Sequence, residues 1–132
     1  MYLSLDYGNR YIGIAATDSD GRIPYRYGVI DQKNQDPFNV LAEIIAKEHV
    51  THILVGVPIS LDGNETEQTH KTLEFIEKLR AVVDPDIDIE GVDETLTSIE
   101  AQQVLRHEGG DPKQEHSEAA RLILSDYLKT VA

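Results

Sequence analysis

The chain opens with Tyr2-Leu-Ser-Leu-Asp-Tyr-Gly-Asn-Arg-Tyr-Ile-Gly-Ile-Ala-Ala-Thr17, and this stretch decides the fold. Residues 2–7 alternate apolar and polar side chains, a pattern that predicts a β-strand. Gly8-Asn9 is a turn signal, and residues 11–17 are again rich in apolar side chains. We therefore expect a second strand that pairs back on the first in an antiparallel hairpin.

The rest of the chain alternates helix and strand patterns. Asp20-Gly21 is a second hairpin signal, and a third strand is expected over residues 22–30, with Pro24 favouring an edge position. The further elements expected are a helix starting at Asp36-Pro37, a strand over residues 51–57, a helix over residues 65–83, a strand over residues 87–92, a helix from Thr97 or Ser98 to Gly109-Gly110, and a helix over residues 112–128. A meander followed by right-handed crossovers gives an α/β fold, a five-stranded mixed sheet with helices on both faces.

Helical spacing also indicates which side chains face the core. In the helix over residues 65–83, Leu73, Ile76 and Leu79 lie on one stripe. In the last helix the side chains expected to point inward are Ala119, Ala120, Ile123, Leu124 and Leu128. The length of 132 residues predicts a single domain over residues 1–132.

Composition limits the class of protein. Hydrophobic residues make up 40% of the chain and charged residues 27%, as in ordinary globular proteins. The longest apolar stretches have only the length of a strand, so we expect no membrane span. The sequence has no secretory signal pattern and no cysteine, which excludes disulfides and thiolate metal sites. These features favour a cytoplasmic location.

The net charge of −12 limits how the chain can bind nucleic acid. It carries 24 acidic residues against 12 lysines and arginines. Affinity for a phosphate backbone comes mainly from lysine and arginine, so strong non-specific binding is not expected. Divalent cations can still bridge carboxylates to phosphates, so the charge is compatible with a metal-dependent enzyme.

Acidic side chains stand at the ends of two predicted strands. Asp6 ends the first strand, and Asp93 and Glu94 follow the fifth. Ligand sites in open α/β sheets form at the carboxyl ends of parallel strands, and carboxylates gathered there repel unless a hard divalent cation neutralises them. Phosphodiester cleavage is the reaction that most needs such a site. The alternative is structural: Asp6 as a turn residue and the Asp93-Glu94 pair as first-turn acids favoured by a helix dipole.

Four segments of the sequence also carry a family resemblance. They are Leu5-Asp-Tyr-Gly-Asn-Arg-Tyr-Ile-Gly-Ile-Ala15, Val55-Gly-Val-Pro58 with Leu61-Asp-Gly-Asn-Glu65, Asp93-Glu-Thr-Leu-Thr-Ser-Ile-Glu-Ala101, and Ala119-Ala120 through Ile123-Leu-Ser-Asp-Tyr-Leu128. In this order they resemble the motifs of the YqgF/RuvX family, Holliday-junction-resolvase-like proteins with an RNase H-like fold. The likeness covers nearly the whole chain.

The resemblance implies a nuclease, a phosphodiester hydrolase that uses Mg²⁺ or Mn²⁺. It implies a nucleic-acid substrate, either precursor 16S ribosomal RNA or branched Holliday-junction DNA. By position, Asp6 is the first metal ligand and Glu94, with Asp93 nearby, supplies the second. Whether the chain forms a homodimer stays open.

The sequence departs from the family pattern at two positions. The arginine that usually follows the Asp-Glu pair is Thr95 here, and the aspartate expected before the Ser-x-Ala-Ala segment is His116. Glu115 and Glu118 are one and two residues away, which rotates a helical side chain by about 100–200°. Neither can replace the aspartate without a movement of the helix.

His116 therefore has two interpretations. It is a third catalytic residue, which binds Mn²⁺ or acts as general base, although hard cations prefer oxygen ligands. Alternatively it marks lost or weakened catalysis, and the chain is a non-enzymatic RNA- or ribosome-associated binding module. The Thr95 position and the charge of −12 favour this alternative.

Few basic side chains are available to hold a substrate. Arg10, beside the first motif, is the strongest candidate, followed by Lys113 and by Asn64 in the second motif. An actin-like nucleotide-binding domain also begins with Asp-x-Gly after a first strand. That architecture needs a second comparable domain, which 132 residues do not supply.

Overall fold

The computed structural model describes residues 1–58, 65–93 and 112–131. In chain order its elements are β1 (Tyr2–Tyr7), β2 (Tyr11–Thr17), β3 (Pro24–Asp31), α1 (Pro37–Glu48), β4 (His52–Val57), α2 (Glu67–Val82), β5 (Asp88–Asp93) and α4 (Pro112–Val131). The five predicted strands and three of the predicted helices are confirmed. The helix expected between Thr97 and Gly110 lies outside the described residues.

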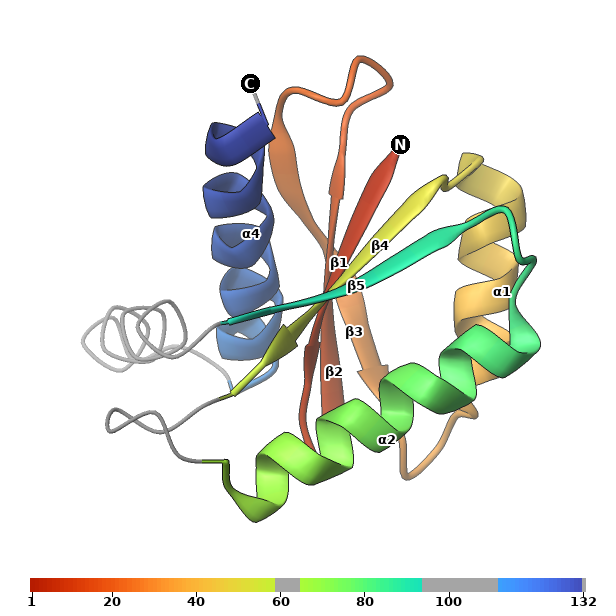
Figure 1. Ribbon diagram of the computed structural model, residues 1–132, viewed down its shortest axis with the longest axis vertical. Coiled ribbons are helices and arrows are strands. Elements are labelled where there is room, and N and C mark those ends of the chain that lie inside the picture. The colour runs from red at the N-terminus through yellow and green to blue at the C-terminus, as the bar shows by residue number, and fades with distance from the viewer. Residues whose placement is uncertain (59–64, 94–111, 132) are drawn as a thin grey trace.

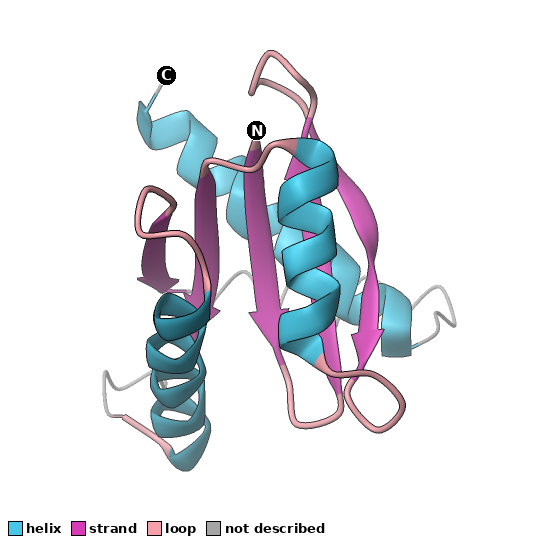
Figure 2. Cartoon of the chain, turned by 90° about the vertical axis from the view of Figure 1, so that its right-hand side faces the viewer, coloured by secondary structure: helices cyan, strands magenta, loops and turns pink. Residues whose placement is uncertain are grey.

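The five strands form one mixed sheet in the order β3-β2-β1-β4-β5. The pairs β1–β2 and β2–β3 are antiparallel, while β1–β4 and β4–β5 are parallel. The helices α1 and α2 cover one face of the sheet and α4 covers the other (Figure 1, Figure 2). The expected five-stranded mixed sheet with helices on both faces is therefore confirmed.

The two faces of the sheet pack differently. The main core lies under α1 and α2, and its fully buried members include Leu3, Leu5, Ile12, Ile53, Val55 and Leu79. The face under α4 is lined by smaller residues: Ala15 packs with Ala120 and Leu124 of the helix, and Gly13 lies against the backbone of His116 and Ser117. Because small side chains line this contact, the backbone of α4 approaches the sheet closely. Ser4 Oγ donates a hydrogen bond to the carbonyl of Ala120 at this contact.

Local hydrogen bonds explain where two elements begin. The strand β3 starts at Pro24 rather than at residue 22 because the backbone N–H groups of Arg22 and Ile23 both donate to Asp18 Oδ1 in the preceding turn. Pro24 lies on the edge strand, as expected. The helix α2 starts at Glu67 because Thr66 caps it, with a reciprocal pair of hydrogen bonds between Thr66 and Thr69.

The prediction that Leu73 faces the core is wrong. Its side chain is 40% exposed, while Ile76 and Leu79 are buried as expected. Phe75 occupies the core instead, together with Thr69 and Thr72. Among the residues that the structure describes, none of the helices has the length and apolar content that a membrane span requires.

Candidate active site

Asp6 lies on the central strand of the sheet, on the face that α4 covers. Its cross-strand neighbours are Gly13 on β2 and Gly56 on β4. Neither glycine contributes a side chain, so the carboxylate has no flanking side chain within its own row of the sheet. Asp6 is 8% exposed, which makes it the one carboxylate among the buried residues of the described chain.

His116, in the first turns of α4, contacts this carboxylate directly. Its Nδ1 lies 3.0 Å from Asp6 Oδ2. An ionised carboxylate can only accept a hydrogen bond, so Nδ1 of His116 must be the donor. In the neutral imidazole this leaves the lone pair on Nε2. The structure thus brings together two of the predicted site residues, which are 110 positions apart in the chain.

Two glycines of the first motif make room for His116. A Cβ atom on Gly13 would overlap the backbone carbonyl of His116 and the N–H of Ser117. A Cβ atom on Gly8 would lie 3.0 Å from His116 Cε1 and 2.7 Å from the Tyr11 carbonyl oxygen. The glycines beside Asp6 therefore have a physical explanation: they let the helix and the imidazole ring reach the carboxylate.

The pairing changes the acidity of His116. The hydrogen bond to Asp6 raises the pKa of the imidazole above its ordinary value, while partial burial acts in the opposite direction. The nearby charges of Asp6 and Glu115 add to the increase in pKa. An imidazole with a raised pKa is a stronger base in the neutral form, which suits it to accept a proton.

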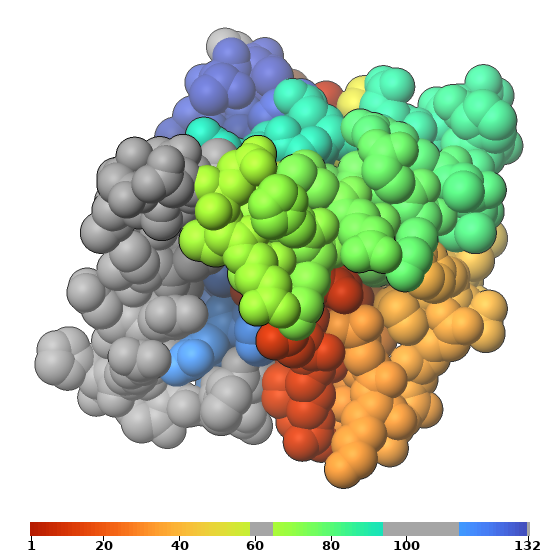
Figure 3. All heavy atoms as spheres, turned by 60° about the horizontal axis from the view of Figure 1, so that its bottom comes forward, coloured from red at the N-terminus to blue at the C-terminus, as the bar shows by residue number. Residues whose placement is uncertain are grey.

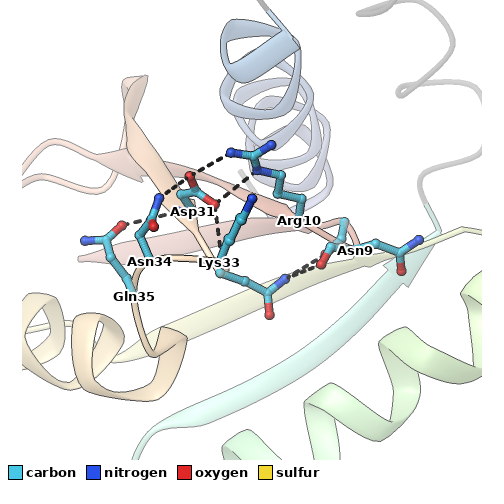
Figure 4. A network of polar contacts seen from close by, with 8 residues as sticks. Asn9, Arg10, Asp31, Lys33, Asn34 and Gln35 are labelled. Carbon is cyan, nitrogen blue, oxygen red and sulfur yellow. Dashed lines mark hydrogen bonds and ion pairs between the residues drawn. The ribbon is translucent and has the colours of Figure 1, made fainter.

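Arg10 extends the site along the turn between β1 and β2. Its Nε lies 3.3 Å from Asp31 Oδ1 and its Nη2 lies 3.4 Å from Asp31 Oδ2 (Figure 4). Its guanidinium carbon lies 4.9 Å from the centre of the Tyr11 ring. The Tyr11 ring in turn lies 6.0 Å from the His116 ring, centre to centre. Arg10, Tyr11, His116 and Asp6 thus form a continuous series of contacts.

The turn itself is held by two glutamines from other parts of the chain. Gln68 Nε2 donates to the carbonyl of Tyr7 at 3.2 Å, and Gln32 Nε2 donates to the carbonyl of Gly8 at 2.8 Å. Seen from this end of the molecule, the start of α4 (light blue) is set back behind the turn (red) and the start of α2 (yellow-green) (Figure 3). Asp6 is 8% exposed and the His116 side chain is 30% exposed, so the pair is largely shielded from solvent.

The structure describes the other predicted site residues only in part. Asp93 is exposed at the end of β5, where it pairs with Val57 of β4. The row of paired residues that contains Asp6 continues through Gly56 to Val92, so Asp93 lies one residue beyond that row. Lys113 lies in the first turn of α4, and its side chain is outside the described part. Glu94 and Asn64 lie outside the described residues. Within the described ranges, no three His, Asp or Glu side chains come close enough to hold a metal ion together.

Asp31, Gln32 and Gln68 are site residues that sequence reasoning missed. No local pattern connects them to the first motif. Only the pairing of β2 with β3, which sets Tyr11 opposite Asp31, brings residue 31 to residue 10. The two glutamines are recognisable only from the hydrogen bonds that they donate to the turn.

Solved structures show what the fold is. Thermus thermophilus RuvC matches with a TM-score of 0.57 and 12% identity, covering 98% of this chain and 96% of that one. The Fowlpox virus resolvase, solved with substrate Holliday junction DNA, matches with a TM-score of 0.52 and 12% identity over 98% of this chain and 97% of that one. The expected RNase H-like fold is confirmed.

Sequence comparison identifies the family. The family model "RuvX: Holliday junction resolvase" matches residues 1–130. A protein of Maridesulfovibrio salexigens named "Putative pre-16S rRNA nuclease" is 37% identical over an alignment of 131 positions that covers 96% of each chain. A protein of Dictyoglomus turgidum with the same name is 35% identical over an alignment of 137 positions that covers 98% of this chain and 94% of that one. The four motifs, the fold and these matches agree, and the chain belongs to the RuvX family.

Proposed function

We propose that the chain is a divalent-metal-dependent endonuclease that hydrolyses phosphodiester bonds in structured nucleic acid, with precursor 16S rRNA as its substrate. Family membership and the names of its relatives support a nuclease. The observation that carries the proposal is the buried Asp6 carboxylate bound to His116 Nδ1 at 3.0 Å. Processing of ribosomal RNA would place the protein in the cytoplasm.

The oxygen atoms of Asp6 suit a hard cation. Oδ2 accepts from His116, and within the described residues Oδ1 has no hydrogen-bond partner. Asp6 Oδ1 would hold Mg²⁺ or Mn²⁺, with Glu94 and Asp93 as the further carboxylates, because both ions prefer oxygen ligands. When bound, the ion would neutralise phosphate charge and lower the pKa of water.

His116 would act as the general base. Asp6 keeps the proton on Nδ1, so the Nε2 lone pair can accept a proton from the attacking water. The water oxygen would form the new bond to phosphorus, the ester P–O bond would break, and the leaving oxygen would take up a proton from solvent, to which His116 later returns the proton that it accepted. Asp6 also stabilises the imidazolium that results, since its negative charge lies beside the ring.

Substrate contacts would come from a few polar side chains near this pair. Arg10 is held beside Tyr11 on the turn that follows Asp6, and the backbone of Lys113 lies three residues before His116. Arg10, Lys113 and Asn64 would contact the phosphate backbone and fix its position. With only 12 basic residues in the chain, we expect recognition to depend on metal ions and on substrate shape.

The test is cleavage of a precursor 16S rRNA fragment and of a four-way DNA junction, with Mg²⁺, with Mn²⁺ and with a chelator. We expect metal-dependent cleavage by the natural chain and loss of activity in His116→Ala, while His70→Ala, on the exposed face of α2, stays active. If only His116→Asp cleaves, the natural chain is the non-enzymatic binding module. Size-exclusion chromatography of the same samples tests for a homodimer.

A further inference from the structure

We infer that Asp31 is a positioning residue for nucleic-acid binding, which holds the Arg10 guanidinium in place to receive a phosphate of the substrate. The inference rests on the proposed nuclease function and adds a residue to it. An acidic side chain is an unexpected part of a site for a polyanion. The geometry nevertheless gives Asp31 a definite task (Figure 4).

Asp31 orients the guanidinium through two bonds. Nε and Nη2 of Arg10 face the two carboxylate oxygens of Asp31, at 3.3 and 3.4 Å. This is the side-by-side arrangement that fixes the plane of a guanidinium group. Tyr11 supports the group from one face, with 4.9 Å between its ring centre and the guanidinium carbon. Within the described residues Nη1 has no hydrogen-bond partner, so one edge of Arg10 remains available.

Asp31 itself is firmly held. Its Oδ1 accepts from the backbone N–H of Lys33 at 3.1 Å, and its Oδ2 accepts from Asn34 Nδ2 at 2.9 Å. Its carbonyl accepts from the N–H groups of Asn34 and Gln35. The Asp31 side chain is 18% exposed and that of Arg10 is 53% exposed. Asp31 is therefore the fixed member of the pair, and Arg10 is the member that faces solvent.

The loop that carries Asp31 is also tied to the turn beside Asp6. The backbone N–H of Gln32 donates to the carbonyl of Arg10 at 2.8 Å, and its side chain donates to the carbonyl of Gly8 at 2.8 Å. Gly8 lies directly against the His116 ring. Arg10 is consequently held at a defined place relative to the Asp6–His116 pair.

Two effects of Asp31 oppose each other, and this makes the inference testable. Its negative charge repels a phosphate, so an acid with no other role would weaken substrate binding. Its bonds order a long and exposed side chain before the substrate arrives, which strengthens binding. Removal of the charge should tighten binding if repulsion dominates and should weaken binding if positioning dominates. We expect positioning to dominate.

The first measurement compares Asp31→Asn with Asp20→Asn. Both remove one negative charge, but Asp20 lies in the exposed turn between β2 and β3. With a precursor rRNA fragment as substrate, Asp31→Asn should raise KM about threefold to tenfold, because an exposed arginine regains rotamer freedom. Its kcat should stay within about twofold. Asp20→Asn should leave KM unchanged or slightly lower. A lower KM in Asp31→Asn would overturn the inference.

A double-mutant cycle separates positioning from general damage to the fold. In an Arg10→Ala background, Asp31→Asn should no longer raise KM, because the residue that it positions is gone. An equal rise in both backgrounds would assign Asp31 a purely structural role and would overturn the inference. Circular dichroism and thermal melting of each variant check that the fold is kept.

A spectroscopic measurement distinguishes failure of this inference from failure of the proposed function. In ¹⁵N-labelled protein, the Arg10 Nε–H should exchange slowly with water in the natural chain and rapidly in Asp31→Asn. If the natural chain neither binds nor cleaves nucleic acid, the proposed function fails. Equal exchange rates in the two proteins would instead show that Asp31 does not hold Arg10, whatever the activity.

Discussion

Two histidine–aspartate pairs lie at opposite ends of the parallel strands, and they differ mainly in the burial of the aspartate. His116 and Asp6 are 3.0 Å apart, and His52 and Asp88 are 3.2 Å apart. The histidine side chains are similarly exposed, at 30% and 35%. The side chain of Asp6 is 12% exposed, whereas that of Asp88 is 76% exposed.

The difference follows from the position of each strand. Asp6 lies on the central strand β1 and is covered by α4, whereas Asp88 begins the edge strand β5. A charge that is shielded from water interacts more strongly with its partner, because the local dielectric is lower. We therefore expect the buried pair, and not the exposed one, to belong to a reactive site. The predictions that follow test this contrast.

The largest contrast is expected in catalysis. Asp6→Asn should reduce cleavage of a precursor rRNA fragment about 1,000-fold or more, since the proposed metal ligand and the partner of the proposed general base are lost together. Asp88→Asn should leave the rate within about twofold. Cleavage by Asp6→Asn at the natural rate would remove Asp6 from the reaction.

The second contrast concerns stability, and it compares Gly13, which lies against α4, with a glycine that has open space at its side-chain position. Gly13→Ala should lower the free energy of unfolding by about 1–3 kcal/mol, because its Cβ overlaps the backbone of His116 and the helix must shift. Gly28→Ala is the matched control, because no atom lies within 4 Å of the place that its Cβ would occupy. Chemical denaturation measures both. Equal stability of the two variants would mean that α4 does not depend on the close contact at Gly13.

The third contrast concerns the acidity of His116. In metal-free protein, Asp6→Asn should lower the pKa of His116, because the hydrogen bond that raises it loses its charged acceptor. The raised pKa means that the folded chain binds this proton more tightly than the unfolded chain. The resulting stabilisation is fully present below the ordinary imidazole pKa and is lost as the pH rises through the raised value.

NMR titration of the His116 ring in the presence of a chelator measures this change. The thermal stability of the natural chain relative to Asp6→Asn should then fall as the pH rises across the same range. An unchanged pKa in Asp6→Asn would show that the carboxylate does not stabilise the imidazolium.

The smallest effect is expected at the exposed pair. A double-mutant cycle on His52→Ala and Asp88→Ala should give a coupling energy of about 0.5 kcal/mol or less, as for other solvent-exposed ion pairs. The His52 ring also stacks on Tyr2 with 4.6 Å between ring centres, so the single variant His52→Ala should cost more than the coupling energy. A coupling above about 1 kcal/mol would contradict the contrast between the two pairs.

Most of the fold could be predicted from the sequence because its signals are local. The alternation in residues 2–7, the turn at Gly8-Asn9 and the cap at Asp36 each act within a few residues. The prediction failed at Leu73, where helical spacing alone could not show that Phe75 faces the core instead. The organisation as a single domain stays a prediction.

The candidate site could be predicted only in part. Asp6 stood out because it ends a predicted strand and matches the family pattern, and His116 stood out because it departs from that pattern; the structure brings the two together. Asp31 could not be foreseen, because the role proposed for it depends on a side-chain contact across β2 and β3 that no local pattern encodes. Sequence patterns thus indicated the proposed reacting groups, while the residues proposed to hold them in place could be found only from the three-dimensional pairing of the strands.

The separation of 110 positions between Asp6 and His116 has a consequence for biosynthesis. A ribosome makes Asp6 first and must add more than a hundred further residues before His116 exists. The nascent chain can form the hairpin of β1 and β2 early, but it has no imidazole beside Asp6 until α4 emerges. If the chain cuts ribosomal RNA as proposed, the ribosome that translates it is protected from the growing chain until synthesis of the catalytic pair is complete.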